Sequence, residues 1–297
     1  MTETVQTIGS HDGERIAQNC VCCGSRNLAR SPAILMPFVA YRAFGWQAVE
    51  ITPEWGLRTI PTGLAYPLCN SVQCADCGLL FLDIRFNNFE MNAMYHGYRS
   101  SAYAEMRGRF EPGYLATNVT INNGVTYVPQ IEDFLSPHLH FPVRILDWGG
   151  DTGQNAPFAA QRSLLHVYDI SDRPVVSGGE LVGQATVQST EYDLIICANV
   201  LEHIPYPGDV VRDIGRSMHR DTVLYVEVPR EPIFSDDETS KELHKKKRHW
   251  HEHINFFSDQ SLTELMERSG LKIIDRKLLN VSDGYHNYYR VLACKLK

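Results

Sequence analysis

From residue 143 onward, apolar segments of strand length alternate with amphipathic segments of helix length. Four segments fit buried strands: VRILDW (143–148), LLHVYDI (164–170), YDLIICA (192–198) and TVLYVEV (222–228). Helices are predicted at 154–162, 206–219 and 259–269. Strands that alternate with helices favour an α/β fold with a doubly wound parallel sheet, in which a ligand binds beyond the carboxyl ends of the strands.

Two further segments of strand character, LKIIDRKLL (271–279) and YYRVLACKL (288–296), follow each other without an obvious helix between them. Strands joined by a short connection pair antiparallel. This pair is therefore expected at one edge of the sheet.

The rest of the sequence divides the chain into regions of different character. A helix is predicted in YVPQIEDFLSP (127–137), within an otherwise mixed and aromatic region. The predicted regions are a flexible N-terminus (1–19), a metal-binding module (20–86), a helical connector that covers the ligand site (87–142) and the α/β domain (143–297).

Six of the eight cysteines fall in the first 77 residues, and four of them form two copies of the pattern C-x-x-C-G. Two thiolates two residues apart can hold one metal ion, while the glycine allows a tight turn. Together the two pairs predict a structural zinc site made of Cys20, Cys23, Cys74 and Cys77. The alternatives are reduced core cysteines, or disulfides, which a reducing compartment disfavours.

Cys22 and Cys69 are spare thiols that could replace a zinc ligand. The long insert between the two cysteine pairs must fold back on itself, and strands are expected in AILMPFVAYRAF (33–44) and LLFLDIRF (79–86). A closed site of four thiolates has no open coordination position, so its role would be to hold a small zinc-ribbon-like module together.

The first strand of the α/β domain ends in an acid and runs into a turn rich in glycine. The residues of this turn that are candidates for ligand binding are Asp147, Gly149, Gly150, Asp151 and Gly153. Glycines let the backbone approach a ligand closely because no Cβ intervenes. We expect a helix to start in this turn.

About twenty residues later the second strand ends in Asp169, followed by Ile170. An acid at this point can accept hydrogen bonds from the two hydroxyls of a ribose, which implies a cofactor that contains a nucleoside. A pyrophosphate would be repelled by Asp151, whereas the cationic S-adenosylmethionine suits two acids in the loop. The alternative is an isolated glycine-rich turn without a ligand.

In the glycine-rich turn and the acid at the end of the second strand, the chain resembles the class I S-adenosylmethionine-dependent methyltransferases. Asp147, Gly149 and Gly153 match the first motif of that family, and Asp151 stands where the motif usually has glycine. NVLEH (199–203), VEVPR (226–230) and FFSDQSLTELMERSGL (256–271) are similar to later segments of the family. The resemblance implies a Rossmann-like, mostly parallel sheet of seven strands.

The same resemblance implies roles for single residues. Asp147, Gly149 and Gly153 would line the methionine end of the cofactor, and Asn199 and Leu201 would border the transferring methyl group. A helix-capping role is the alternative for Asn199, and packing is the alternative for His203. Tyr95 and Tyr98 could cover the cofactor, although buried packing explains these tyrosines as well.

The cysteine module, followed by CGLLFLD, is similar to the zinc-binding front end of a subgroup that includes deoxysugar C-methyltransferases. That subgroup carries a tyrosine, histidine, glutamate, histidine run before the last helix, where this chain has Trp250, His251, Glu252 and His253. The resemblance makes Glu252 and His253, with His251 beside them, candidate catalytic residues. Methylation of carbon requires a base, and histidine titrates near neutral pH.

The predicted function is therefore methyl transfer to a small molecule, such as a sugar, either free or nucleotide-linked, or a secondary-metabolite intermediate. The basic run 245–248 would suit a nucleotide diphosphate, and a solvated loop is the alternative. Transfer to oxygen or nitrogen of another natural-product or polysaccharide precursor remains open, as does an inactive cofactor-binding scaffold.

The formal net charge of −7 disfavours a nucleic acid as the main partner. No apolar run approaches the roughly 18 residues of a membrane span, and MTETVQTIGSHDGER lacks the basic start and apolar stretch of a secretory signal. The sequence predicts a cytoplasmic protein with no membrane partner, and it leaves the oligomeric state open.

Overall fold

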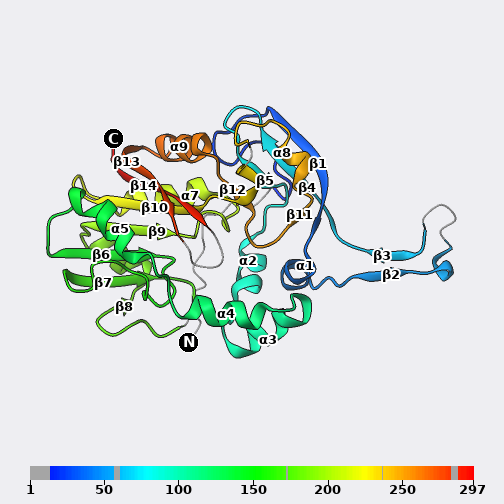
Figure 1. Ribbon diagram of the computed structural model, residues 1–297, viewed down its shortest axis with the longest axis horizontal. Helices are drawn as coiled ribbons and strands as arrows, with labels where there is room; N and C mark the ends of the chain where they lie inside the picture. The colour runs from blue at the N-terminus through cyan, green and yellow to red at the C-terminus, as the bar shows by residue number, and fades with distance from the viewer. Residues whose placement is uncertain (1–13, 57–60, 172, 236, 282–286) are drawn as a thin grey trace.

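The computed structural model describes residues 14–56, 61–171, 173–235, 237–281 and 287–297. A larger sheet and a smaller sheet lie beside each other, and a group of short helices, α2 to α4, lies along one side of both (Figure 1). These helices are α2 (Asn88–Tyr95), α3 (Ser101–Phe110) and α4 (Tyr114–Asn122).

The larger sheet has seven strands in the order β13-β14-β10-β9-β6-β7-β8. They are β6 (Val143–Trp148), β7 (Arg162–Tyr168), β8 (Glu180–Leu181), β9 (Leu194–Ala198), β10 (Val223–Pro229), β13 (Leu271–Asn280) and β14 (Tyr288–Leu296). The strands from β6 to β10 pair parallel, whereas β14 pairs antiparallel with both β10 and β13. The mostly parallel sheet and its antiparallel edge pair are confirmed.

The two faces of this sheet are covered by different helices, as the alternation of side chains along each strand requires. Ile145 of β6 packs in one cluster with α5 (Val128–Leu135). Its neighbour Leu146 points to the other face, whose cluster includes residues of α6 (Gln184–Ser189), α7 (Pro207–Arg216) and α9 (Asp259–Arg268). The sheet is therefore doubly wound, as predicted.

The helices predicted at 206–219 and 259–269 are confirmed as α7 and α9. The side chain of Ser258 accepts a hydrogen bond from the amide of Ser261 and so caps α9. Gly270, which follows the helix, has a φ of 85°. The helix predicted in 127–137 is confirmed as α5.

The helix predicted at 154–162 is wrong, because residues 149–161 form a series of turns. Asp151 and Phe158 have φ angles of 53° and 60°, which an α-helix does not allow. Pro157 also disfavours helical geometry at the residue before it. The Asn155 side chain accepts a hydrogen bond from Val125, and the amide of Phe158 donates to Glu132, so the loop is held by other segments.

The smaller sheet has five strands in the order β11-β1-β4-β5-β12. They are β1 (Leu28–Leu35), β4 (Leu68–Cys74), β5 (Leu80–Leu82), β11 (His249–Trp250) and β12 (Asn255–Phe256). The strand predicted at 79–86 is confirmed in β5. The strand predicted at 33–44 is mostly wrong, because Pro37 is the first residue of a helix, α1 (Pro37–Phe44), which ends at Gly45 with a φ of 66°.

Residues from the C-terminal half complete this smaller sheet. β11 pairs parallel with β1, and β12 pairs antiparallel with β5. The cysteines of the module also share one buried cluster with residues of α7 and α9. The predicted boundary at residue 86 stays a prediction, but the sheet that holds the cysteines takes two of its strands from 249–256.

Of the predicted flexible N-terminus (1–19), residues 1–13 lie outside the described part of the chain. The remainder, 14–19, is tied to the smaller sheet: Ile16 bridges Ile84, and the amide of Ala17 donates to the carbonyl of Asp83 at 2.8 Å. A two-stranded ribbon, β2 (Val49–Ile51) with β3 (Gly63–Ala65), extends away from the rest of the protein (Figure 1).

The remaining short helices lie in connections. They are α8 (Leu243–Lys246) and three 3-10 helices, η1 (Pro53–Trp55), η2 (Ser136–His138) and η3 (Pro232–Phe234). Within the described residues, no helix has the length and apolar character that a membrane crossing requires.

Candidate active site

A pocket of about 400 Å³ lies at the carboxyl ends of the parallel strands. Residues that directly follow β6, β7 and β9 line it, and so do Tyr95 and Tyr98 from the segment that contains helices α2 to α4. Strand order reverses between β6 and β9, which is the place where α/β sheets bind ligands. The pocket is thus the candidate active site.

The turn after β6 leaves no room for side chains. A Cβ atom on Gly150 would lie 2.2 Å from the carboxyl carbon of Asp147, and one on Gly149 would lie 2.5 Å from a methyl group of Val200. Gly149 also has a φ of 76°, which favours glycine. The backbone of this turn therefore lies directly against the Asp147 carboxylate and the pocket.

Asp147 is only 5% exposed. Burial, together with the negative charges of Asp169 and Asp151, raises its pKa from 3.8 to about 7. A positively charged group beside Asp147 would favour its ionised form. The carboxylate pair of Asp147 and Asp169 makes this end of the pocket suited to a cationic ligand.

Asp169 accepts hydrogen bonds from the amides of Asp151 (2.7 Å) and Ser171 (2.6 Å). Asp151 in turn forms ion pairs with Arg173 and, at 3.5 Å, with Arg99. Asp151 is therefore a structural link between the loops after β6 and β7, and its charge is balanced by two arginines.

Asn199, directly after β9, lines the pocket with a φ of 56°. Its side-chain amide donates to Glu227 Oε1 at 2.8 Å, and the same oxygen accepts from the Tyr127 hydroxyl at 2.8 Å. Glu227 Oε2 accepts from the Tyr225 hydroxyl at 2.5 Å. All four residues of this network line the pocket. The side-chain hydrogen bond of Asn199 is to Glu227 and not to the end of a helix.

Glu252 and His253 reach the pocket from the connection between β11 and β12. The Arg107 guanidinium, 4% exposed, pairs with Glu252 at 2.7 Å. Nδ1 of His253 lies 2.8 Å from Glu231 Oε1. A carboxylate that holds Nδ1 directs the opposite nitrogen, Nε2, as in enzymes where histidine acts on a substrate.

His203 lies against His253, with ring centroids 4.6 Å apart. Its Nδ1 lies 3.1 Å from the carbonyl of Glu252 and 3.0 Å from the Tyr95 hydroxyl. Burial lowers the pKa of His203 to about 3, so the ring is neutral near neutral pH. Burial also raises the pKa of the neighbouring Glu202 well above its ordinary value.

Most of the residues predicted to bind the cofactor line the pocket, as the following set does: Asp147, Gly149, Gly150, Asp151, Asp169, Ile170 and Asn199. Three other predicted site residues lie outside its lining. Gly153 faces Val167, and Leu201 is fully buried in the core. His251 turns toward Glu111, 3.6 Å away. The lining also contains no residue of the basic run 245–248.

Sequence reasoning missed several charged residues of the pocket and its surroundings. Glu202 lies within the quoted segment NVLEH, and Glu227 lies within VEVPR, but neither was assigned a role. An acid inside an otherwise apolar strand segment, as at Glu227, is a usable signal because buried charges need partners. Arg107 and Glu231 carry no such signal.

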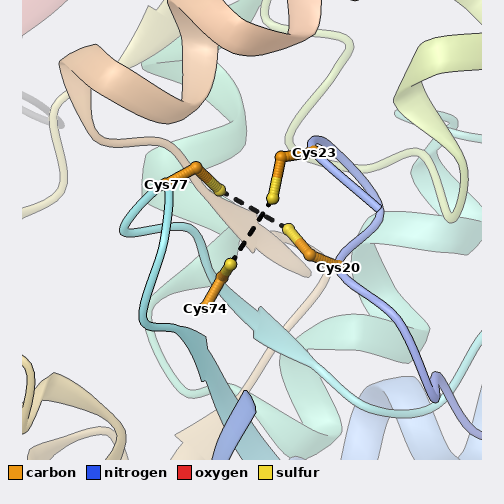
Figure 2. Close-up of side chains that lie close together, drawn as sticks. All are labelled: Cys20, Cys23, Cys74 and Cys77. Carbon is orange, nitrogen blue, oxygen red and sulfur yellow. Dashed lines mark hydrogen bonds between the residues drawn. The ribbon is translucent and has the colours of Figure 1, made fainter. Parts of the chain in front are cut away.

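The four predicted zinc ligands come together. The Sγ atoms of Cys20, Cys23, Cys74 and Cys77 all lie within 4.8 Å of one another and point toward a common centre (Figure 2). The closest pairs, Cys20 with Cys77 and Cys23 with Cys74, have Sγ atoms 3.5 Å apart. Four thiolates around zinc at about 2.3 Å would lie about 3.8 Å apart.

The two spare thiols do not belong to this cluster. Cys22 is buried in the same hydrophobic core as the four clustered cysteines but is not one of the converging thiols. Cys69 is buried in a separate core with Leu80 and Trp250. The donor set thus fits one tetrahedral metal ion without a substitute ligand.

A protein-family model described as a methyltransferase domain matches residues 123–276. None of the curated proteins matches the sequence.

Two solved structures are among those to which the chain is similar. The chain is similar to the Burkholderia thailandensis 1,6-didemethyltoxoflavin-N1-methyltransferase with bound 1,6-didemethyltoxoflavin and S-adenosylhomocysteine, at 17% identity and a TM-score of 0.46, covering 66% of this chain and 89% of that chain. It is also similar to the Synechocystis PCC 6803 magnesium protoporphyrin IX methyltransferase with bound S-adenosylmethionine, at 13% identity and a TM-score of 0.43, covering 70% of this chain and 97% of that chain.

Proposed function

The chain belongs to the methyltransferase-domain family that its residues 123–276 match, and on that premise we propose that it transfers a methyl group from S-adenosylmethionine to a small molecule. The observation that carries the proposal is the pair of pocket carboxylates, Asp147 and Asp169, at the reversal of strand order. A pocket of about 400 Å³ suits a small acceptor.

The acidic turn favours S-adenosylmethionine over a dinucleotide. When bound, S-adenosylmethionine supplies an electrophilic methyl group on a positively charged sulfonium. Asp147 faces the pocket with a carboxylate that a cation would stabilise. A dinucleotide would instead need a helix N-terminus for its pyrophosphate, and residues 149–161 form turns.

Asp169→Ala tests the cofactor assignment. The variant removes a charged acceptor for the ribose hydroxyls, a bond worth about 1.5–3 kcal/mol, so the affinity for S-adenosylmethionine should fall roughly ten- to hundredfold. Isothermal titration calorimetry measures this, and Asp169→Asn, which keeps one acceptor oxygen for the loop amides, is the matched control for loop order. Unchanged affinity in a folded Asp169→Ala variant would remove the assignment.

The raised pKa of Asp147 predicts a pH dependence of cofactor binding. Below about pH 7 the carboxyl of the unliganded protein is mostly protonated, and the cationic cofactor favours its ionised form. Affinity should therefore rise roughly tenfold between about pH 5.5 and 7, with a proton released on binding. In the unliganded protein, the contribution of Asp147 to stability falls as the pH rises from about 4 to 7, because this carboxyl ionises at lower pH in the unfolded chain than in the folded one.

Calorimetry in buffers of different ionisation enthalpy measures the released proton. Asp147→Asn should remove both the proton release and the rise in affinity. If the affinity of this variant for S-adenosylmethionine rose with pH as that of the wild type does, a group other than Asp147 would be titrating. The charged groups that act on Asp147 are Asp151, Arg162, Asp169 and Glu227.

We further propose that the acceptor is a hydroxylated, sugar-like molecule that binds in the pocket beside the side chains of Glu252 and His253. The Arg107–Glu252 pair and His253 offer polar groups that can hydrogen-bond to hydroxyls, and the tyrosines Tyr95 and Tyr98 offer apolar surface beside them. Glu231 holds Nδ1 of His253, so Nε2 is the atom with which His253 acts on the acceptor.

The cysteine cluster is proposed to hold one structural zinc ion. The support is the set of four Sγ atoms within 4.8 Å, drawn from two C-x-x-C-G turns. Gly24 and Gly78, which end the two turns, have φ angles of 75° and 76° and so allow each turn to close. Such a site is closed and serves the fold rather than the chemistry.

A further inference from the structure

A second group of metal-ligating side chains lies in the pocket itself. Glu202 and His203 follow β9, and His253 comes from the connection between β11 and β12. One ligand atom of each lies within 4.8 Å of the other two. Two imidazoles and one carboxylate from distant parts of the chain thus converge at the acceptor end of the pocket.

Glu202 is the unexplained member of this group. Its side chain lines the pocket and is 1% exposed, yet neither carboxylate oxygen has a hydrogen-bond partner in the described part of the chain. A buried carboxylate without a partner is costly, and proteins resolve that cost by pairing it with a cation or a metal. Nε2 of His203 lies 3.9 Å from Oε1 of Glu202.

Both histidines are oriented as metal ligands usually are. A ligating imidazole binds the metal through one ring nitrogen and donates the N–H of the other nitrogen to a carbonyl or a carboxylate, which fixes the tautomer and the ring. Nδ1 of His203 lies 3.1 Å from the carbonyl of Glu252, which can only accept, so Nδ1 carries the proton. Nδ1 of His253 lies 2.8 Å from Glu231. In each ring the ligand atom is then Nε2.

We propose that Glu202, His203 and His253 bind one divalent transition-metal cation in the pocket. Imidazole and carboxylate donors select a cation of this class, and three protein ligands leave positions open for a substrate. The cysteine cluster differs in both respects, because its four thiolates leave no position open.

The role of the cation rests on the proposed function. An open position facing the pocket suits an oxygen of the acceptor, either the hydroxyl to be methylated or a carbonyl beside the methylated carbon. In both cases the cation would stabilise the negative charge on this oxygen when the proton of the hydroxyl, or of the carbon beside the carbonyl, passes to a water molecule. His253 would then act on the acceptor through the cation, since its Nε2 lone pair is used as a ligand.

Titration of the full chain with Mn²⁺ tests the site, with free Mn²⁺ measured by electron paramagnetic resonance. Mn²⁺ has little affinity for thiolates, so the cysteine cluster does not contribute. The expected result is one bound Mn²⁺ per chain. Glu231→Gln changes a residue that contacts a ligand but does not itself bind the metal, and it should weaken Mn²⁺ binding by about 10- to 100-fold. Glu202→Gln changes a ligand, and it should weaken Mn²⁺ binding by more than this range.

Glu90→Gln is the matched control, because Glu90 is a buried glutamate in the capping box of α2 and should leave Mn²⁺ binding unchanged. Wild-type protein that binds no Mn²⁺, or a Glu202→Gln variant that binds it as the wild type does, would overturn the inference. Calorimetry with S-adenosylmethionine on the same samples separates the two proposals: cofactor binding without Mn²⁺ binding would overturn the metal site alone, and the reverse would overturn the proposed function alone.

Discussion

Replacing Cys74 with serine is expected to release the zinc ion and to unfold the smaller sheet. Cys74 ends β4 and lies 3.5 Å from Cys23, Sγ to Sγ. The binding free energy of a structural zinc ion, about 10–16 kcal/mol, is available to folding only while all ligands are present. The loss should reach the active site, because β11 and β12, which flank Glu252 and His253, belong to this sheet.

Elemental analysis of protein purified without added metal should find one more zinc ion per chain in the wild type than in Cys74→Ser, because the proposed site of Glu202, His203 and His253 also accepts zinc and is unchanged in sequence. Hydrogen exchange of the amides in 20–86 should become fast in the variant. Cys69→Ala is the matched control, since Cys69 is buried outside the cluster and should keep the zinc. Full zinc content and unchanged exchange in Cys74→Ser would contradict the site.

The parallel sheet was predictable from sequence because its strands are buried on both faces. Such strands, as in LIICA of β9, appear as continuous apolar runs that turns interrupt clearly. The helix predicted after β6 fails for a tertiary reason. Hydrogen bonds from Val125 to Asn155 and from Phe158 to Glu132 hold this loop to segments that are distant in sequence. A local pattern does not contain those partners.

Contacts between segments distant in sequence limit the prediction of the smaller sheet even more. The two C-x-x-C-G turns identified the cysteine cluster from spacing alone, since thiolate ligands leave a clear pattern. The contribution of 249–256 to this sheet could not be predicted, because β11 and β12 are two residues each. Strands that short carry no periodicity.

The candidate site was predictable where a motif places residues next to one another along the chain, as in the turn after Asp147. It was not predictable where the site depends on distant contacts. His251 and His253 are alike in sequence, but the chain turns between β11 and β12, so His253 faces Glu231 and His251 faces Glu111. Only the fold distinguishes the two histidines.

His253→Asn should lower methyl transfer by about 10²–10⁴-fold and leave the affinity for S-adenosylmethionine unchanged. The range is that of a group that moves or stabilises a proton in the transition state. Asparagine can keep a hydrogen bond to Glu231 but has no atom equivalent to Nε2. Asp147 and Asp169, which we propose bind the cofactor, are untouched by the change.

The measurement is turnover on a panel of small acceptors that includes keto sugars, with cofactor affinity determined in parallel. His249→Asn is the matched control, because His249 is exposed on β11 and should have wild-type turnover. Where the acceptor is methylated on carbon beside a ketone, His253→Asn should also stop exchange of the acidic carbon-bound proton with deuterated solvent, since deprotonation needs no methyl donor. Exchange that continues in the variant would show that His253 neither takes that proton nor holds the group that acidifies it.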